Sequence, residues 1–329
     1  MTENRQHVLV TGGAGYIGSH TAKALSQRGY IPVTYDSLVR GQRHAVRWGP
    51  LVEGDIGDKA MVLETLRRYE IRAVLHFAAF AYVGESVRHP GRYFDNNVTK
   101  SVALLDACVE AGMQHFVFSS SCATYGTPER IPISEETPQL PLNPYGESKL
   151  AMERQLKWYG NAHRFTWKAL RYFNAAGADP DGEIGEEHSP ETHLIPLVLE
   201  AALGRSTVEI YGDDYPTPDG TCVRDYIHVS DLAEAHVRAL DALREGSPSM
   251  ALNLGTGEGQ SVRQVIEAVE SVTGRKVPRR VVARREGDPA ALVADPALAG
   301  KVLGWRPQCS DMESIVSSAW KWHTRGMED

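Results

Sequence analysis

Short apolar runs alternate along the first half of the chain with longer segments in which apolar residues recur every three or four positions. The runs predict buried strands at residues 8–11, 31–36, 51–53, 73–77, 115–120 and 167–172. The periodic segments predict helices at residues 16–28, 59–69, 95–111 and 144–159. Because strands that alternate with helices form parallel βαβ units, we expect an α/β fold with a doubly wound, Rossmann-type parallel sheet.

The pattern changes after residue 174. Residues 175–224 are rich in glycine, proline, aspartate and histidine, and they contain one predicted helix, near residues 195–203. From residue 223 to 239 we expect the chain to return to the large sheet, with a helix from Ser230 onward and a core strand near residues 251–255. Helices at residues 261–273 and 312–323 would belong to a smaller, mixed α/β cap.

Three glycines, Gly12, Gly15 and Gly18, lie where the first strand turns into the first helix, around Tyr16 and Ile17. Glycines at this turn allow the backbone to approach a pyrophosphate, and the N-terminus of the helix offers free N–H groups. The strand–turn–helix order therefore predicts a dinucleotide site, and a merely flexible loop is the alternative.

Asp36 ends the second strand, 18 residues after Gly18. A carboxylate at this position hydrogen-bonds the 2′-OH of the adenosine ribose and repels a 2′-phosphate, so Asp36 favours NAD over NADP. Arg40 and Arg43 follow in the same loop and could pair with a phosphate, so the preference is not absolute.

Further candidates follow the other strands, where the carboxyl ends of a parallel sheet meet at one edge. They are Asp55, Ile56, Phe77, Ala78, Ala79 and the serines that end with Ser121. The predicted division is therefore a dinucleotide-binding domain (residues 1–174 with about 225–255) and a substrate domain (about 175–224 with 256–329).

Tyr145 and Lys149 are four residues apart on a predicted helix, so their side chains share one face. An ammonium group beside a phenol favours the phenolate, which is a competent general base toward a hydroxyl group. Ser121, at a strand end, can relay or share that proton. The alternative is a serine-rich turn beside a solvated helix face.

Composition excludes several other classes of protein. The formal net charge of −7 argues against binding to nucleic acid, and the sequence holds no apolar run long enough to cross a membrane. The four cysteines are widely spaced and the twelve histidines show no paired metal-ligand spacing. Residues 1–7 are polar and do not resemble a signal peptide. We expect a cytoplasmic protein without a metal.

Taken together, the glycine turn, Asp36, Ser121 and the Tyr145-x-x-x-Lys149 pair resemble the extended short-chain dehydrogenase/reductase superfamily. Residues 11–20, 83–87, 95–98, 170–174, 223–229 and 284–288 narrow the resemblance to the UDP-glucose 4-epimerases. The similarity extends from about residue 8 to about residue 322. The serine motif at residues 121–126 resembles a branch that includes exopolysaccharide-linked and pentose-type epimerases.

The resemblance implies NAD as the cofactor, UDP-glucose and UDP-galactose as the substrates, and a homodimer built on helices 95–111 and 144–159. It implies that Tyr145 takes the proton of the sugar 4-OH while NAD takes a hydride from C4. The 4-keto sugar then rotates and receives the hydride on its other face. Lys149 would lower the Tyr145 pKa and touch the nicotinamide ribose.

The resemblance also assigns individual contacts. Asn96 and Phe173 join the residues above as cofactor contacts. Arg224 and Arg285 would bind the diphosphate, since guanidinium groups match phosphate oxygens, and Asn174 could also meet a phosphate. Asp288 would hold the uridine ribose, and Leu292 would border the C2 substituent of the sugar. His193 departs from the family, which often has asparagine at this position.

Other functions remain open at this stage. The epimerase could prefer another UDP-sugar, such as UDP-xylose, UDP-arabinose or UDP-N-acetylglucosamine. A nucleotide-sugar dehydratase would need an acid/base pair after the central serine, where this chain has Cys122 and Ala123. A non-catalytic NAD-binding regulator would not need Ser121, Tyr145 and Lys149.

Overall fold

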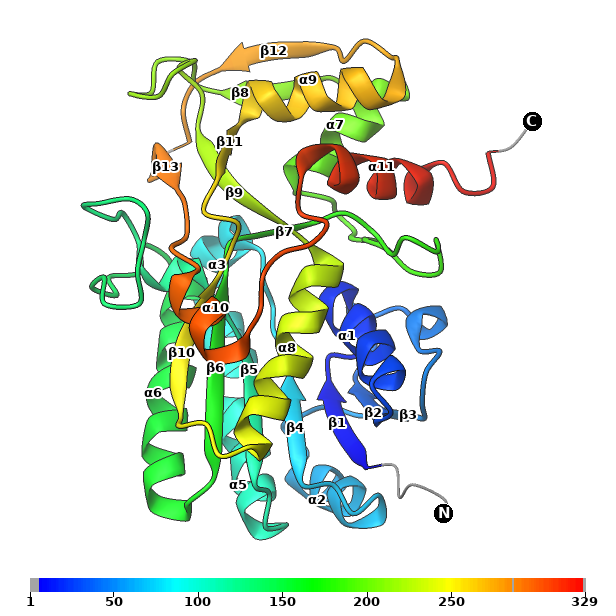
Figure 1. The fold of residues 1–329 in the computed structure, drawn as a ribbon, viewed down its shortest axis with the longest axis vertical. Coiled ribbons are helices and arrows are strands. Elements are labelled where there is room, and N and C mark those ends of the chain that lie inside the picture. Colours follow the sequence, from blue (N-terminus) through cyan, green and yellow to red (C-terminus); the bar gives the residue numbers. More distant parts are fainter. Residues whose placement is uncertain (1–5, 286, 328–329) are drawn as a thin grey trace.

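A seven-stranded parallel sheet occupies the lower part of the computed structural model, which describes residues 6–285 and 287–327 (Figure 1). The strand order is β10-β6-β5-β4-β1-β2-β3. The strands are β1 (His7–Thr11), β2 (Ile31–Asp36), β3 (Leu51–Glu53), β4 (Ala73–His76), β5 (His115–Ser121), β6 (Thr166–Tyr172) and β10 (Met250–Leu254). All six strands predicted in the first half are present within one residue at either end, and the doubly wound α/β fold is confirmed.

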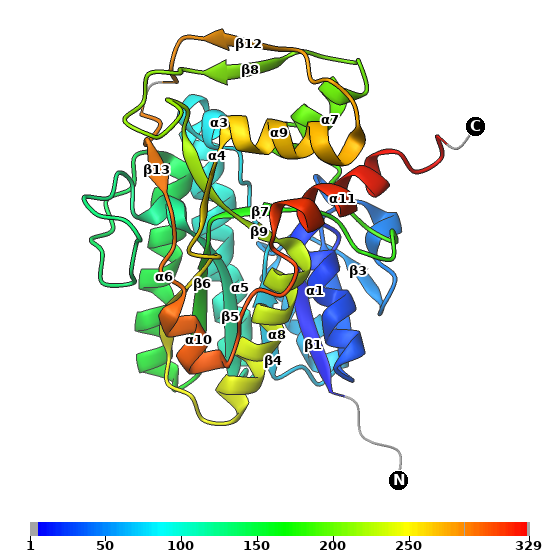
Figure 2. The same cartoon turned by 45° about the horizontal axis from the view of Figure 1, so that its top comes forward.

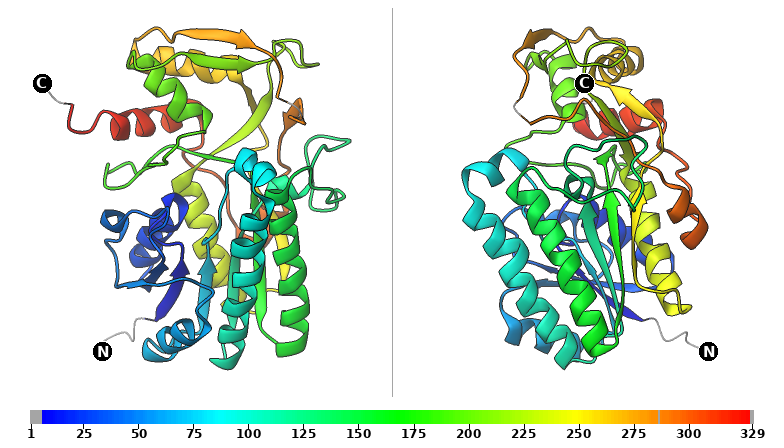
Figure 3. Two further views of the ribbon diagram at one scale, coloured as in Figure 1. Left: turned by 180° about the vertical axis from the view of Figure 1, so that it is seen from behind. Right: turned by 90° about the vertical axis from the view of Figure 1, so that its left-hand side faces the viewer.

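Helices cover both faces of this sheet, as the side view shows (Figure 3). Alternate residues of β1 point to opposite faces: Val8 and Val10 pack with α1 and α8, and Leu9 packs with α2, α5 and α6. The helices are α1 (Tyr16–Gln27), α2 (Lys59–Arg68), α5 (Lys100–Glu110), α6 (Pro144–His163), α8 (Val229–Arg244) and α10 (Ala297–Leu303). The sheet is thus buried on both faces, as its apolar strands require.

Helix α6 carries the predicted Tyr145–Lys149 pair. It starts at Asn143, whose side chain accepts a hydrogen bond from the Gly146 N–H at 2.9 Å, and Pro144 occupies the first helical position. The helix continues to His163, four residues beyond the predicted end, and stops where Arg164 adopts a left-handed conformation.

Two short helices between β4 and η2 were not predicted, α3 (Val83–Arg88) and α4 (Pro90–Phe94). The predicted 95–111 helix is present, but its first five residues form a π-helical turn, η2 (Asp95–Thr99). Two 3₁₀ turns, η1 (Arg43–Ala45) and η3 (Cys122–Thr124), were also missed. Helices of five or six residues are too short to show a clear apolar period.

A smaller cap lies above the carboxyl ends of the large sheet (Figure 2). Its strands form a four-stranded sheet and a separate pair, and its helices share one apolar core. The strands are β7 (Asn174–Ala176), β8 (Val208–Tyr211), β9 (Val223–His228), β11 (Gly259–Ser261), β12 (Arg279–Val282) and β13 (Ala291–Leu292), and the helices are α7 (Leu194–Ala202), α9 (Val262–Thr273) and α11 (Met312–His323).

The predicted return to the large sheet at residue 223 is wrong for its first six residues. Strand β9 pairs with β7, β11 and β13 in the cap, and the return begins with α8 at Val229. Asp225 of β9 is fully buried and accepts hydrogen bonds from the N–H groups of Thr256 and Ala294. These partners are distant in sequence, so local periodicity could not indicate which sheet the strand joins.

None of the helices among residues 6–285 and 287–327 combines the length and the apolar character needed to cross a membrane.

Candidate active site

A pocket of about 1600 Å³ lies between the carboxyl ends of the large sheet and the cap. The strand order reverses at β1 and β4, which is where doubly wound sheets bind ligands. Of the predicted site residues, the lining includes Gly12, Gly15, Tyr16, Ile17, Gly18, Phe77, Ala79, Ser121, Tyr145, Lys149, Phe173, Asn174, Arg224, Arg285, Asp288 and Leu292. Residues from both ends of the chain therefore meet in one cavity.

The glycine turn after β1 fits a dinucleotide pyrophosphate. Gly12 has a φ of 72°, and a Cβ atom there would lie 2.6 Å from the backbone nitrogen of Ala78. A Cβ at Gly18 would lie 2.3 Å from the carbonyl oxygen of Gly12, so only glycine permits this close turn. Among the described residues, no side chain caps α1 and its first turn holds no acidic residue. Its positive N-terminus is therefore available to an anion.

Five predicted cofactor contacts lie outside the pocket lining: Asp36, Asp55, Ile56, Ala78 and Asn96. Asp55 pairs with Lys100 at 2.6 Å, and Ile56 is buried among core side chains. Ala78 packs partly against the same core. Asn96 donates a hydrogen bond to the side chain of Asn97, 3.0 Å away.

Asp36 is turned toward the backbone. Its carboxylate accepts hydrogen bonds from the Ala14 N–H at 3.0 Å and the Leu38 N–H at 2.8 Å. Burial raises the Asp36 pKa, although both hydrogen bonds act to lower it. Asp36 thus stabilises the glycine turn through its hydrogen bond with Ala14, a contact that its spacing from Gly18 did not reveal.

Tyr145, Lys149 and Ser121 meet in the pocket, and all three side chains are buried. The Lys149 ammonium donates a hydrogen bond to the Ser119 carbonyl oxygen at 2.8 Å and lies 5.8 Å from the centre of the Tyr145 ring. Asn97 bonds to Ser148, between the two, and to the backbone of Phe80. The helical spacing thus places phenol and ammonium side by side, as predicted.

The lowering of the Tyr145 pKa by Lys149 stays a prediction. Burial raises this pKa well above its ordinary value, while a contact with Ser121 acts in the opposite direction. Burial also lowers the Lys149 pKa to about 7, against the effect of Glu153. Loss of hydration disfavours the charged form of both groups.

On the cap side of the pocket, the basic residues already have partners. Arg224 forms an ion pair with Asp288 at 2.5 Å, although we expected them to contact different parts of a nucleotide sugar. The Arg285 guanidinium stacks on the Tyr211 ring, 3.8 Å from its centre. Leu292 packs partly against the apolar cluster that includes Phe173. Arg224 and Arg285 are thus fixed in place at the pocket wall.

A cluster that we did not predict surrounds His193. Its Nδ1 atom lies 2.7 Å from Glu186 and 2.9 Å from Glu191, and His188 Nδ1 lies 3.0 Å from Glu186. Burial acts to lower the His193 pKa, but Glu186 and Glu191 prevail and raise it. Burial likewise acts to raise the Glu186 pKa, but hydrogen bonds from His188 and His193 prevail and lower it. These four side chains lie close enough to hold a metal ion. The absence of a metal therefore stays a prediction.

Comparisons with known proteins agree with this geometry. Residues 8–255 match the model of the NAD dependent epimerase/dehydratase family. A UDP-glucose 4-epimerase of Rhizobium meliloti is 53% identical over 320 residues, which are 97% of each chain. A UDP-glucose 4-epimerase from Brucella ovis, solved in complex with NAD, is 56% identical with a TM-score of 0.94, covering 96% of this chain and 97% of that one.

A third relative was solved with a different sugar nucleotide. The UDP-glucose-4-epimerase from Stenotrophomonas maltophila, with bound NAD and formylated UDP-arabinopyranose, is 43% identical. It has a TM-score of 0.95 and covers 98% of this chain and 99% of its own. With a matching family model and relatives above 50% identity over nearly the whole length, the chain belongs to the NAD dependent epimerase/dehydratase family.

Proposed function

We propose that this protein is an NAD-dependent 4-epimerase that interconverts UDP-glucose and UDP-galactose through a 4-keto intermediate. One observation carries the proposal: a single pocket brings the glycine turn, the Tyr145–Lys149 pair and Arg224 together. The similar proteins from Rhizobium meliloti and Brucella ovis bear this activity in their names and support it.

When bound, NAD supplies the reversible oxidation of the sugar at C4. Tyr145 then receives the proton of the 4-OH and later returns it, with the Ser121 hydroxyl beside it to share that proton. A protonated Lys149 stabilises the Tyr145 phenolate, and the phenolate in turn favours the protonated lysine, so the two groups titrate as a coupled pair. Burial keeps water from competing for the proton.

The cap holds the nucleotide sugar by its charge. Arg224 and Arg285 line the pocket and would contact the diphosphate, and Asn174 would add an amide. Asp288, which orients Arg224, would contact the uridine ribose. The sugar is thereby held at its diphosphate end, which leaves the 4-keto ring free to present either face.

Incubation of the purified protein with UDP-glucose, UDP-galactose, UDP-N-acetylglucosamine and UDP-xylose, followed by separation of the products, tests the proposal. We expect UDP-glucose and UDP-galactose to interconvert fastest. The alternative is a preference for a pentose, since the relative from Stenotrophomonas maltophila binds a UDP-arabinopyranose derivative. Turnover of UDP-xylose alone would establish that alternative, and no turnover of any sugar would favour a non-catalytic regulator.

The purified protein should carry NAD or NADH without any being added. A cofactor that is regenerated in each cycle need not leave, and the glycine turn and Asp36 favour NAD. Denaturing the protein and analysing the released nucleotide measures this. Finding NADP, or no nucleotide together with activity only on added NADP, would contradict the role of Asp36.

Leu292 is expected to admit an N-acetyl group at C2, giving secondary activity on UDP-N-acetylglucosamine. Leu292→Tyr should reduce this activity by roughly 10–200-fold more than that on UDP-glucose, the range for small changes in an apolar pocket. Val281→Tyr, on exposed β12, is the control. Equal losses on both sugars would show that Leu292 serves only to pack the cap.

We also propose the interleaved domains described above, a homodimer and a cytoplasmic location. Separate apolar cores on the two faces of the large sheet and in the cap support the division, except that α10 (Ala297–Leu303) packs with the core of the large sheet and belongs to that domain. The four cysteines are free thiols, which suits a reducing compartment. Light scattering measures the mass in solution, and fractionation of cells measures the location.

A further inference from the structure

Residues 177–193, which we call the strap, connect β7 to α7 and form one wall of the pocket. The strap starts beside the N-terminus of α1, where the Tyr16 hydroxyl donates a hydrogen bond to the Gly177 carbonyl oxygen at 2.6 Å. Its later residues Ile184, Gly185, Glu186 and His188 line the pocket. A movement of the strap would therefore open the cavity next to the glycine turn.

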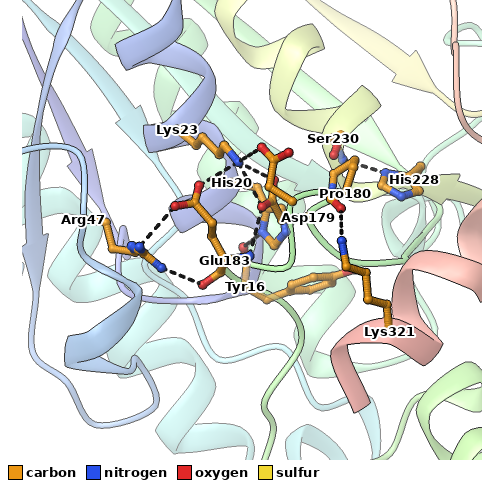
Figure 4. Close-up of polar contacts among 11 residues, drawn as sticks. Tyr16, His20, Lys23, Arg47, Asp179, Pro180, Glu183, His228, Ser230 and Lys321 are labelled. Carbon is orange, nitrogen blue, oxygen red and sulfur yellow. Dashed lines mark hydrogen bonds and ion pairs between the residues drawn. The ribbon is translucent and has the colours of Figure 1, made fainter. Parts of the chain in front are cut away.

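Lys23 joins the strap to helix α1 (Figure 4). Its ammonium lies 2.8 Å from Asp179, 2.7 Å from Asp181 and 2.9 Å from Glu183. An ammonium group has three N–H donors, so one lysine satisfies all three carboxylates. These carboxylates are close enough together to hold a metal ion, but Lys23 already stands among them.

The strap is shaped so that these carboxylates converge. The Asp179 N–H bonds to the Ile184 carbonyl oxygen at 3.0 Å, and the Gly182 N–H bonds to the Asp179 carbonyl oxygen at 2.8 Å. The Glu183 N–H also donates to the Asp179 carboxylate at 3.1 Å. Residues 179–184 thus form a closed turn around the ammonium group.

Two further contacts hold the same turn from outside. Arg47 pairs with Glu183 at 3.1 Å, and Lys321 of α11 donates to the Pro180 carbonyl oxygen at 2.7 Å (Figure 4). Both are more exposed than Lys23, whose side chain is 10% exposed. Exposed pairs contribute little, whereas removing one partner of a buried pair is costly. The pair of Lys23 with Asp179, whose side chain is 5% exposed, is therefore the main anchor, and the exposed Asp181 adds little.

The anchor is continuous with the pocket wall. Ile184 is the last residue of the turn and is buried, and a Cβ atom at the next residue, Gly185, would lie 2.4 Å from the Trp322 ring. Lys23 thus holds one end of a tightly packed segment whose other end lines the pocket. A loosened turn would displace Ile184 and Gly185, which line the pocket. Tyr16, which bonds to the strap at Gly177, is the first residue of α1 and directly follows the turn that fits a pyrophosphate.

We propose that Lys23 is a positioning residue that holds the strap closed against α1 through Asp179, Asp181 and Glu183, and that this contact slows the dissociation of bound NAD. The inference rests on the proposed function, in which NAD stays bound through many turnovers. The Lys23 contact would explain why NAD is retained, although Lys23 does not touch the reacting atoms.

Exchange of bound NAD for isotopically labelled NAD, measured on the purified holoenzyme, tests this inference. Lys23→Met keeps most of the length of the side chain and removes its charge. We expect it to accelerate exchange by about tenfold or more, the change for the loss of about 1.4 kcal/mol, with kcat at saturating NAD unchanged within a few-fold. Cleavage by a glutamate-specific protease within the strap should accelerate in parallel.

Arg28→Met is the matched control, because Arg28 caps the C-terminus of the same helix and pairs with Asp241 and Glu234 of α8 instead of the strap. It should exchange NAD at the wild-type rate. If Lys23→Met does not fold, Glu183→Gln carries the test, with a smaller acceleration. The inference would be overturned if Lys23→Met, or Glu183→Gln in its place, exchanged NAD at the wild-type rate. It would also be overturned if Arg28→Met accelerated exchange by the same factor. A preparation without any bound nucleotide would instead contradict the cofactor retention on which it rests.

Discussion

Replacing Tyr145 with phenylalanine is expected to lower kcat by about 10²–10⁴-fold, the usual contribution of a positioned general base. The change removes only the hydroxyl group that would exchange a proton with the sugar 4-OH. The ring would still pack at the start of α6, beside the Lys149 ammonium. Bound NAD and the unfolding transition should therefore match the wild type, and kcat for UDP-galactose is the measurement.

Tyr159→Phe provides the control for this experiment. Tyr159 lies on the same helix, and its hydroxyl donates a hydrogen bond to Asp106 at 2.7 Å, away from the pocket. It should keep wild-type turnover. If Tyr145→Phe turns over within a few-fold of the wild type, the base lies elsewhere, and Ser121 would be the next candidate.

The chemistry of the pocket was predictable where it depends on short spacing. Tyr145 and Lys149 are one helical turn apart, and the glycine turn follows β1 directly, so local sequence alone places these groups. The large sheet was predictable for the same reason, because each buried strand is a short apolar run. The large sheet, the glycine turn and the Tyr145–Lys149 pair are each formed by residues that are close together in the sequence.

Contacts between distant segments were not predictable from local patterns. Lys23 meets Asp179 across 156 residues, and the pairing of Arg224 with Asp288 spans 64. Nothing in the spacing of Glu186 and His193 shows that their side chains converge. The pKa values of Tyr145 and Lys149 were also inaccessible, because burial depends on the packing of the whole cap over the sheet.

Arg171→Met is expected to have the largest effect on stability, a loss of about 3–5 kcal/mol in the free energy of unfolding. Arg171 of β6 and Glu153 of α6 are both 7% exposed, and their charged groups lie 2.6 Å apart. Arg171 also donates to the Tyr125 hydroxyl at 2.7 Å, and Ser120 donates to Glu153 at 2.5 Å. Without Arg171, the buried Glu153 carboxylate would lose its counter-charge.

Urea unfolding of the NAD-saturated protein, followed by tryptophan fluorescence, measures the loss. Lys59→Met is the control, because Lys59 pairs with Glu110 on the surface and should change stability by only about 0–1 kcal/mol. A change below about 1 kcal/mol for Arg171→Met would mean that water or another group compensates the Glu153 charge.

The double variant Arg171→Met/Glu153→Leu separates the two causes of this loss. If the cost comes from an unpaired buried charge, removing Glu153 as well should restore much of the stability. Glu153 also lies one turn after Lys149 and raises its pKa against the effect of burial. The double variant should therefore regain stability but not activity at neutral pH, since a neutral Lys149 cannot stabilise the Tyr145 phenolate. Full recovery of both would show that Glu153 serves the core alone.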